Sequence, residues 1–374
     1  MFFDNNQKTF LELVRAGLWE KEARLLPLGK VDYEAVMRLA EEQSVVGLVT
    51  AGLEHVSDVK VPQEELLQFI GRSLQIESVN SEMNDFVWGL VEKMRKVGIY
   101  TLLVKGQGIA QCYERPLWRT SGDVDFLLSD DNYKKALDFL LPMASSHEEE
   151  LIGEKHIGMT IDSWVVELHG TMPSRISDRA DRVLKKVQNC VFYEGHVSSW
   201  ISGKTTVFLL HPDEEVVFVF THFLKHFFRG GIGLRQICDW CRLLWSKREM
   251  IDKKILASRL KEMRFMTEWK AFAALTVEVM GMPADAMPFY ERSERMSKKA
   301  QLILNCVLEV GTFGQNREGK LRMSQPSFMK RKWMAFKYKM EDFFYHFRVF
   351  PLDSTRVLFM DLKTGIVSTI RHEG

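Results

Sequence analysis

The sequence predicts an α+β fold in which helical regions at both ends of the chain flank a small mixed β-sheet. Three observations support this prediction. Apolar residues recur at helical spacing over residues 8–96, β-branched and aromatic runs of strand length occur between residues 99 and 169, and the helical period returns from residue 213. We therefore expect three regions: an N-terminal helical region (1–97), an α/β core (98–210) and a C-terminal helical region (211–374).

Composition restricts the class of protein. The 374 residues are 46% hydrophobic, which is enough for a sizeable core, and the net charge of +1 argues against a protein that coats nucleic acid through uniform positive charge. No apolar stretch approaches the roughly 20 residues of a membrane-spanning helix, and residues 1–6 do not resemble a secretory leader. Five scattered cysteines do not indicate a disulfide framework. We therefore predict a cytoplasmic protein with reduced thiols.

Helical segments are expected on both sides of the core. In the N-terminal region the helical pattern breaks at residues 27–29 and 59–62, where proline or glycine interrupts it, and the last helix ends at Gly98. In the C-terminal region five segments keep the period of a helix, and a further long helix is expected from Pro326 to Phe350. The five segments are 214–228, 234–245, 253–263, 266–279 and 297–308.

The core alternates predicted strands with helices. The expected strands are residues 99–104, 123–128, 156–161 and 164–169. A helix is expected over residues 132–140. Only Asp162 and Ser163 separate the last two strands, which predicts an antiparallel hairpin. This order of elements implies a small mixed sheet.

The most informative segment contains Asp123 and Asp125. Residues two apart on a strand point to the same side, so both carboxylates face one space while Val124 and Phe126 face the core. Two adjacent carboxylates repel each other and suit a divalent cation, and Mg²⁺ is usually held by one or two carboxylates together with substrate phosphates. A solvated strand start with incidental aspartates is the competing interpretation, because the pattern is short.

Three neighbouring features favour the metal interpretation. Glu167 is an acidic residue within an otherwise apolar strand, where a carboxylate requires a cation or a hydrogen-bond donor. Lys105 and Gly106 close the first predicted strand at a turn where glycine lets backbone N–H groups approach a phosphate. Arg119 precedes Asp123 by four residues and is placed to meet an anion near the same site. Ordinary turn chemistry and a surface arginine are the competing interpretations of the last two.

The segment from the first strand to the aspartate pair resembles the uncharacterised bacterial nucleotidyltransferase family of the polymerase-β-like nucleotidyltransferase superfamily. The residues that carry the resemblance are Lys105, Gly106, Tyr113, Pro116, Arg119 and the run Ser121-Gly122-Asp123-Val124-Asp125. It extends over about residues 32–244 and includes helical segments on both sides of the core.

The resemblance implies a nucleotidyltransferase core and Mg²⁺-dependent transfer of a nucleoside monophosphate from a nucleoside triphosphate (NTP) to an acceptor hydroxyl, with release of pyrophosphate. It implies that Asp123, Asp125 and Glu167 are the catalytic residues and bind the metal, Mg²⁺ or Mn²⁺, in a two-metal in-line displacement. Glu167 is also expected to accept the proton of the acceptor hydroxyl. Nucleotide contacts are expected from Lys105, Gly106, Gln107, Arg119, Gly122 and His226. The sequence does not identify the acceptor.

Two departures from the superfamily pattern bear on these expectations. Gly-Ser or Gly-Gly is usual at the nucleotide-binding turn, whereas this chain has Gly106-Gln107, which puts the triphosphate contact at that turn in question. Glu167 replaces the commoner aspartate, and its carboxylate binds Mg²⁺ with a longer reach.

Two residue pairs in the C-terminal region have i, i+4 spacing. His222 and His226 share a helix face, and two interpretations stay open: they line the active-site cleft together with Lys225, or they pack in the core. A zinc site is disfavoured because no third ligand is identifiable. Arg235 and Asp239 have the same spacing and predict an ion pair within one helix.

Residues 317–348 form a strongly basic segment, with nine Lys or Arg and three acidic residues, a net charge of +6. Because aromatic residues are interleaved, the segment is a candidate site for an anionic partner, and a solvated helix face is the competing interpretation. Two alternative functions stay open: a non-catalytic protein of this fold that docks an anionic partner, and a toxin-type nucleotidyltransferase that acts on tRNA or protein. The retained carboxylates Asp123, Asp125 and Glu167 favour an enzyme.

Overall fold

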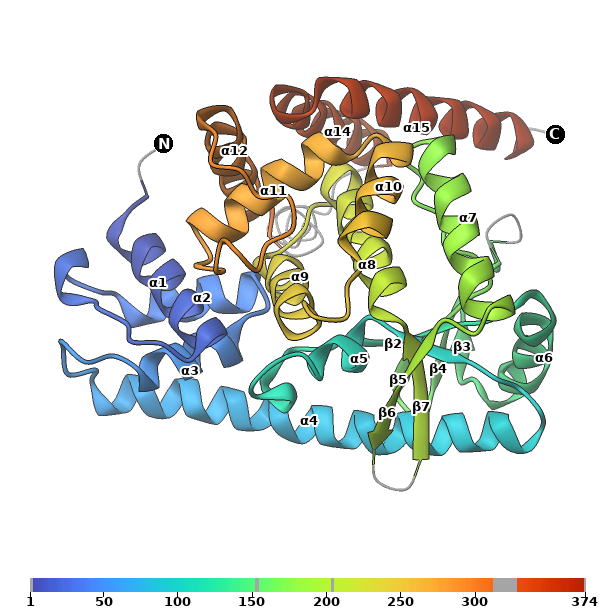
Figure 1. Cartoon of the computed structure of the whole chain (residues 1–374), viewed down its shortest axis with the longest axis horizontal. Helices are drawn as coiled ribbons and strands as arrows, with labels where there is room; N and C mark the ends of the chain where they lie inside the picture. Colours follow the sequence, from blue (N-terminus) through green and yellow to red (C-terminus); the bar gives the residue numbers. More distant parts are fainter. Residues whose placement is uncertain (1–2, 152–154, 203–204, 312–327, 373–374) are drawn as a thin grey trace.

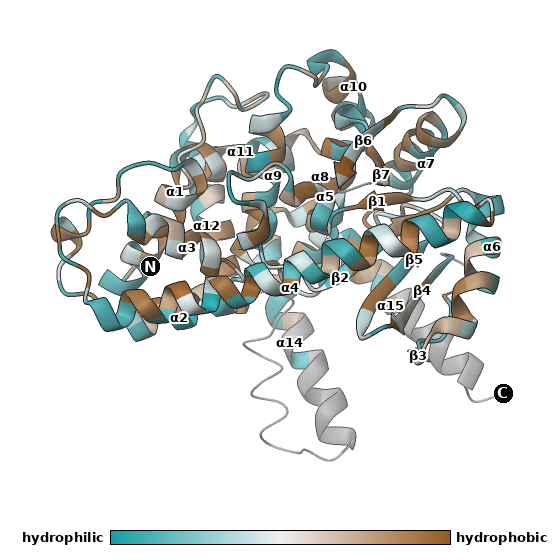
Figure 2. Cartoon of the chain, turned by 90° about the horizontal axis from the view of Figure 1, so that it is seen from below, coloured by the Kyte–Doolittle hydropathy of each residue, from teal (hydrophilic) through white to brown (hydrophobic). Residues whose placement is uncertain are grey.

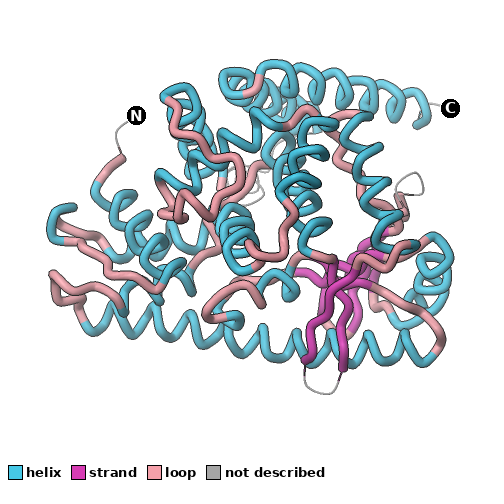
Figure 3. The backbone as a smooth tube through the Cα atoms, in the orientation of Figure 1, coloured by secondary structure: helices cyan, strands magenta, loops and turns pink. Residues whose placement is uncertain are grey.

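The structure is a computed structural model that describes residues 3–151, 155–202, 205–311 and 328–372. Figures 1 and 3 show the strands gathered in one place and surrounded by helices, with the 34-residue helix α4 (Gln63–Lys96) running beneath the sheet. Helices from both ends of the chain flank a mixed sheet, which confirms the predicted α+β class. Within the described ranges, no helix combines the length and the apolar character that a membrane span needs.

The described strands form one sheet of seven in the order β3-β4-β5-β2-β1-β7-β6. Strand β2 lies at the centre, parallel to β5 and antiparallel to β1, and β1 is parallel to β7. Strands β4 and β5 form the predicted hairpin, and the φ values of Asp162 (47°) and Ser163 (72°) are both positive, as in a type I′ turn. The strands are β1 (Leu102–Val104), β2 (Asp123–Leu127), β3 (Ser146–His147), β4 (His156–Ile161), β5 (Trp164–His169), β6 (Val197–Ser202) and β7 (Thr205–Leu210).

Alternation along the central strands separates two faces of the sheet. Val124 and Phe126 of β2, with Val166 and Leu168 of β5, are buried in a core that also contains residues of α4 and of α6 (Asp130–Leu140). The alternate residues Asp123, Asp125, Glu167 and His169 face the C-terminal helices instead. Because the period of a strand is two residues, a slip of one residue would exchange these faces. The hydrophobic residues therefore fix which side chains face the candidate site.

The N-terminal helices α1 (Asn5–Trp19), α2 (Tyr33–Glu42) and α3 (Val46–Glu54) pack at one end of α4. Helices α1 and α3 approach closely at Gly17, where an added Cβ would lie 1.9 Å from the carbonyl oxygen of Leu48. Glycine is therefore required at this crossing.

Helix α4 links the N-terminal helices to the sheet. In its first half Phe69 is buried with the N-terminal helices, whereas Met83, Val87 and Leu90 of its second half are buried under the sheet. Figure 2 shows hydrophilic residues distributed along the outer side of α4. The first half of α4 thus packs against the N-terminal helices and the second half against the sheet. Because both halves belong to one helix, α4 fixes the distance between the N-terminal helices and the sheet.

The C-terminal helices cover the other face of the sheet (Figure 1). Helices α8 and α9 lie nearest to the strands. Phe220, Trp240 and Trp269 are fully buried among the C-terminal helices. The helices are α8 (Pro212–Arg229), α9 (Leu234–Ser246), α10 (Lys253–Met263), α11 (Met266–Glu278), α12 (Glu294–Val310), α14 (Phe328–Val349) and α15 (Pro351–His372).

The elements that the sequence does not predict include helix α7 (Asp178–Tyr193), the short strand β3, the hairpin of β6 and β7, and helix α15. The buried residues of α7 do recur at helical spacing, whereas the three serines of β6 weaken its strand signal. Helix α15 starts at Pro351, where proline suits a first helical turn. Strand β1 is shorter than expected and begins at Leu102, because the backbone N–H of Ile99 still donates to the carbonyl of Met94 at the end of α4.

The basic segment 317–348 falls largely on undescribed parts of the chain. Residues 317–327 and the side chains of residues 328–336, 338 and 339 lie outside the described residues. The anionic partner of this segment therefore stays a prediction.

Candidate functional site

Three carboxylates converge on the face of the sheet that looks toward α8. Strands β2 and β5 are parallel, with Asp125 paired to Glu167 in the register, and Asp123 lies two residues before Asp125 on the same face. One oxygen from each of these carboxylates lies within 4.8 Å of the other two. Hard divalent cations prefer such oxygen ligands. The three residues predicted to bind metal are thus brought together from two neighbouring strands.

Lys105 supplies a positive charge at the centre of this cluster. It follows β1 with a φ of 59°, and its Nζ lies 2.5 Å from Oδ1 of Asp125. Burial would lower the pKa of Lys105, but the charges of Asp125, Glu167 and Asp123 outweigh burial and raise it. The charge of Asp125, followed by burial, raises the pKa of Asp123. An ammonium and a metal ion would therefore compete for the same carboxylate oxygens.

Two histidines that are not among the predicted site residues complete the cluster. Nε2 of His169 lies 2.7 Å from Oδ1 of Asp125 and 3.3 Å from Oε2 of Glu167, and Nε2 of His156 lies 3.3 Å from the same Glu167 oxygen. Burial would raise the pKa of Glu167, but hydrogen bonds from His156 and His169 and the charge of Lys105 lower it strongly. These bonds supply the donors that an acidic residue on an apolar strand requires.

The sequence contained a signal for both histidines. His169 follows Glu167 by two residues, so it shares the face of Glu167, and the hairpin register pairs His156 with His169. Hydrogen bonds to Asp125 and Glu167 outweigh burial and raise the pKa of His169.

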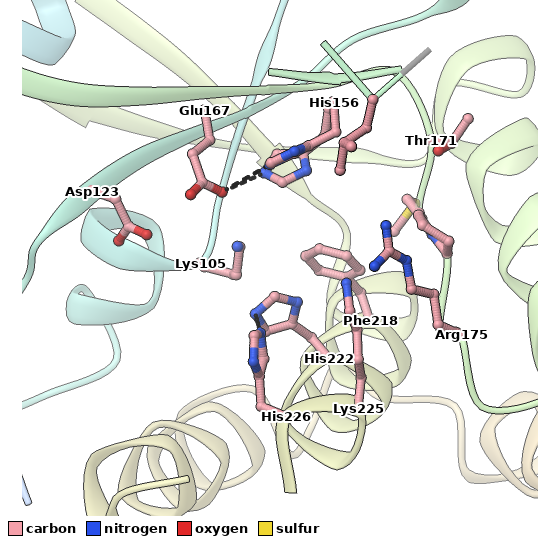
Figure 4. A pocket seen from close by; sticks show the side chains of 14 residues that line it. Lys105, Asp123, His156, Glu167, Thr171, Arg175, Phe218, His222, Lys225 and His226 are labelled. Carbon is pink, nitrogen blue, oxygen red and sulfur yellow. Dashed lines mark hydrogen bonds and ion pairs between the residues drawn. The ribbon is translucent and has the colours of Figure 1, made fainter. Parts of the chain in front are cut away.

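A cavity of about 250 Å³ opens between the carboxylates and helix α8. Figure 4 shows Asp123 and Glu167 on one side, with Lys105 between them and the side chains of α8 opposite. The lining from the helical side includes His222, Lys225 and His226, as one of the two open interpretations expects. Arg175, from the loop that follows β5, completes this wall, and no sequence pattern predicts its position there.

The helical wall is electrostatically suited to an anion. Burial, together with the charges of Arg175, Lys105 and Arg229, lowers the pKa of Lys225 to about 8. Burial and the charge of Lys225 lower the pKa of His226 to about 4, and burial and Lys105 lower the pKa of His222 well below its usual value. A bound anion would oppose these shifts, because negative charge favours the protonated form of each group.

The pair His222 and His226 is not a metal site among the described residues. Their Nε2 atoms lie 3.1 Å apart, but no third His, Cys, Asp or Glu of the described chain joins them in a ligand group. The structure therefore agrees with a role in lining the cavity.

Arg119 lies near Asp123, but a buried carboxylate occupies its guanidinium. It lines a second cavity of about 60 Å³ together with Asp123 and Asp125, and its guanidinium donates two hydrogen bonds, of 2.8 and 2.7 Å, to Asp239. Tyr113 also donates to Asp239, at 2.7 Å. The expected helix pair of Arg235 and Asp239 is thus wrong, since Asp239 pairs with Arg119 and Arg235 donates to the carbonyl of Thr120. The guanidinium of Arg119 donates two hydrogen bonds to the buried Asp239 carboxylate, which satisfies it better than Arg235 on the same helix could.

The Gly106-Gln107 turn does not present Gln107 to the cavity. The Gln107 side chain is 2% exposed, and its amide donates to Asn80 of α4 while its Oε1 accepts from Ser121. Gly106 lines the smaller cavity. Gly122 is exposed and lines neither cavity, and nothing within 4 Å would meet a Cβ there. Of the six expected nucleotide contacts, only Lys105 and His226 line the larger cavity.

Comparison with known proteins identifies one family. A family model described as uncharacterised nucleotidyltransferase matches residues 29–281, more than half of the chain. This range includes the three carboxylates and all residues that line the two cavities. Searches of curated proteins and of solved structures found no significant match.

Proposed function

Because the chain belongs to the uncharacterised nucleotidyltransferase family, we propose that it transfers a nucleoside monophosphate from an NTP to an acceptor hydroxyl, with Mg²⁺ as cofactor and pyrophosphate as product. The observation that carries this proposal is the convergence of Asp123, Asp125 and Glu167 within 4.8 Å at one side of a cavity whose opposite wall is basic. This arrangement suits a metal-bound polyphosphate, because the metal requires anionic oxygens and the phosphates require positive charge.

The carboxylates are the residues that would hold Mg²⁺. Their oxygen-only donor set fits a hard cation, and the lowered pKa of Glu167 keeps that carboxylate ionised at neutral pH. When bound, Mg²⁺ supplies charge neutralisation at the phosphates and lowers the pKa of a coordinated hydroxyl. The same low pKa makes Glu167 a weak base, which favours a role in metal binding over proton abstraction.

Lys225 and Arg175 are proposed to bind the phosphates. Both line the larger cavity, on the side opposite Glu167 in Figure 4. Burial, and then the positive charges of Arg175, Lys105 and Arg229, lower the pKa of Lys225, and phosphate oxygens would offset those charges. Lys105 contacts Asp125, and we propose that its ammonium moves to a phosphate oxygen when the carboxylates hold the cation. Arg119 is paired with Asp239 and Gln107 is buried, so Lys225 and Arg175 are better suited to this role.

Calorimetric titration of the four NTPs, each with and without Mg²⁺, tests this function. The wild-type protein is expected to bind at least one NTP only when Mg²⁺ is present. The double variant Asp123→Asn/Asp125→Asn should bind that nucleotide at least about tenfold more weakly, because it loses both negative charges of β2.

The matched control is Asp138→Asn, which makes the same substitution at an exposed position of α6. It should bind like the wild type. Failure of all four nucleotides to bind the wild-type protein, or equal affinity in the double variant, would contradict the proposed function.

A further inference from the structure

A second group of potential metal ligands adjoins the carboxylates and differs from them in chemistry. His156, Glu167 and His169 each offer one ligand atom, and the three atoms lie within 4.8 Å of one another. The group comes from the two strands of one hairpin, with His156 and His169 directly paired in its register and their ring centroids 4.7 Å apart. The hairpin thus holds two imidazoles and a carboxylate on one rigid element.

The spacing within this group matches a metal polyhedron. Zn²⁺ binds histidine nitrogen and carboxylate oxygen at about 2.0–2.1 Å in tetrahedral geometry, which places neighbouring ligand atoms about 3.3 Å apart. Both histidine Nε2 atoms lie 3.3 Å from Oε2 of Glu167. The same two histidines and Glu167 line the larger cavity, which leaves a side of the group open to a further ligand.

The donor set separates this group from the Mg²⁺ ligands. Imidazole suits Zn²⁺ and other late first-row ions, whereas Mg²⁺ is held through oxygen. We propose that His156, Glu167 and His169 form a binding site for a transition-metal ion of the Zn²⁺ class, next to the Mg²⁺ ligands and sharing Glu167 with them. This site does not depend on nucleotide and goes beyond the proposed function.

Cobalt substitution tests the site, because Co²⁺ takes the place of Zn²⁺ and its visible absorption reports coordination number and ligand type. Purified full-length protein is treated with chelator, dialysed and titrated with Co²⁺ in the absence of nucleotide. One equivalent of Co²⁺ should bind with the strong visible bands of a four-coordinate nitrogen-containing site. Zn²⁺ should displace it and erase the bands, whereas excess Mg²⁺ should leave them in place.

The decisive variant is His156→Asn, which removes one imidazole but none of the three carboxylates. It should lose the bands and bind Co²⁺ at least about tenfold more weakly, because a ligand is missing. The control is His147→Asn, the same substitution at an exposed histidine of the adjacent strand β3, which should retain them. His169→Asn provides a second ligand variant, and thermal melting identifies the variants that fold.

No Co²⁺ binding by the wild type, a six-coordinate spectrum typical of oxygen ligands, or equal binding by folded His156→Asn and wild type would overturn the proposal. Because no nucleotide is added, each of these results is independent of the nucleotide titration that tests the proposed function.

Discussion

Lys225 shows how a single residue of this site responds to its surroundings. It projects from α8 into the larger cavity, where burial and the charges of Arg175, Lys105 and Arg229 lower its pKa to about 8. The neighbouring His222 and His226 have lowered pKa values too, so both are already neutral at and above pH 7. Of these three groups on α8, Lys225 is the one that changes charge above neutrality.

A pH dependence of nucleotide affinity follows. Lys225 is charged below its pKa of about 8 and loses its proton above it. The affinity for NTP with Mg²⁺ should therefore be nearly constant between about pH 7 and 8 and fall by up to about tenfold per pH unit above that range. The variant Lys225→Arg stays charged and should show a flat profile over the same range. Calorimetry across this range measures both, and identical profiles for the two proteins would rule out Lys225 as the titrating group.

Single residues also show what the sequence can predict. The shared face of Asp123 and Asp125 is a local property of a strand, so it could be predicted, and the same alternation contained His169. The pairing of Arg119 with Asp239 could not be predicted, because 120 positions separate the two residues and only the packing of α9 brings them together. The contacts of Gln107 with Asn80 depend in the same way on where α4 crosses the core.

At the scale of elements, the hairpin and the central strands could be predicted from alternation and from the two-residue turn. The weaker signals were those of β6 and α7, whose burial is set by the elements that they pack against.

The ion pair of Arg119 and Asp239 connects α9 to the segment just before β2. Both side chains are 6% exposed, so neither charge can be solvated when its partner is removed.

Removing one member of this pair should destabilise the fold. Asp239→Ala leaves the buried Arg119 guanidinium without its main partner, and we expect the free energy of unfolding to fall by about 3–5 kcal/mol. The double variant Arg119→Ala/Asp239→Ala should lose less than the sum of the two single variants, because the pair is removed as a unit. Urea unfolding measures these values. Additive losses would show that the two side chains do not act together.

At the scale of the whole molecule, the C-terminal helix α15 is joined to the body of the protein partly through acidic residues. Glu268 of α11 is 4% exposed and Asp353 of α15 is 7% exposed. Burial, and then the charge of Asp353, raises the pKa of Glu268 to about 8. A proton bound by Glu268 therefore stabilises the contact of α15.

The sign of the resulting pH dependence is determined by this raised pKa. The stabilisation by protonated Glu268 is fully present below the unfolded-state pKa of about 4.5 and is lost as the pH rises through about 8. Glu268→Gln should therefore gain stability relative to the wild type as the pH rises, by up to about 1.4 kcal/mol per unit of pKa shift. Urea unfolding at several pH values measures this gain. The exposed Glu249→Gln is the control, and a constant difference between Glu268→Gln and wild type would refute the assignment.

A crystal structure of the protein with Mn²⁺ and a non-hydrolysable analogue of the NTP that binds best tests the proposed metal and nucleotide site most directly. Anomalous scattering distinguishes Mn²⁺ from water and from lighter ions. We expect an anomalous peak bound by Asp123, Asp125 and Glu167, with phosphate oxygens against Lys225 and Arg175. A nucleotide bound elsewhere, or one bound in the larger cavity with no metal at the three carboxylates, would contradict this expectation.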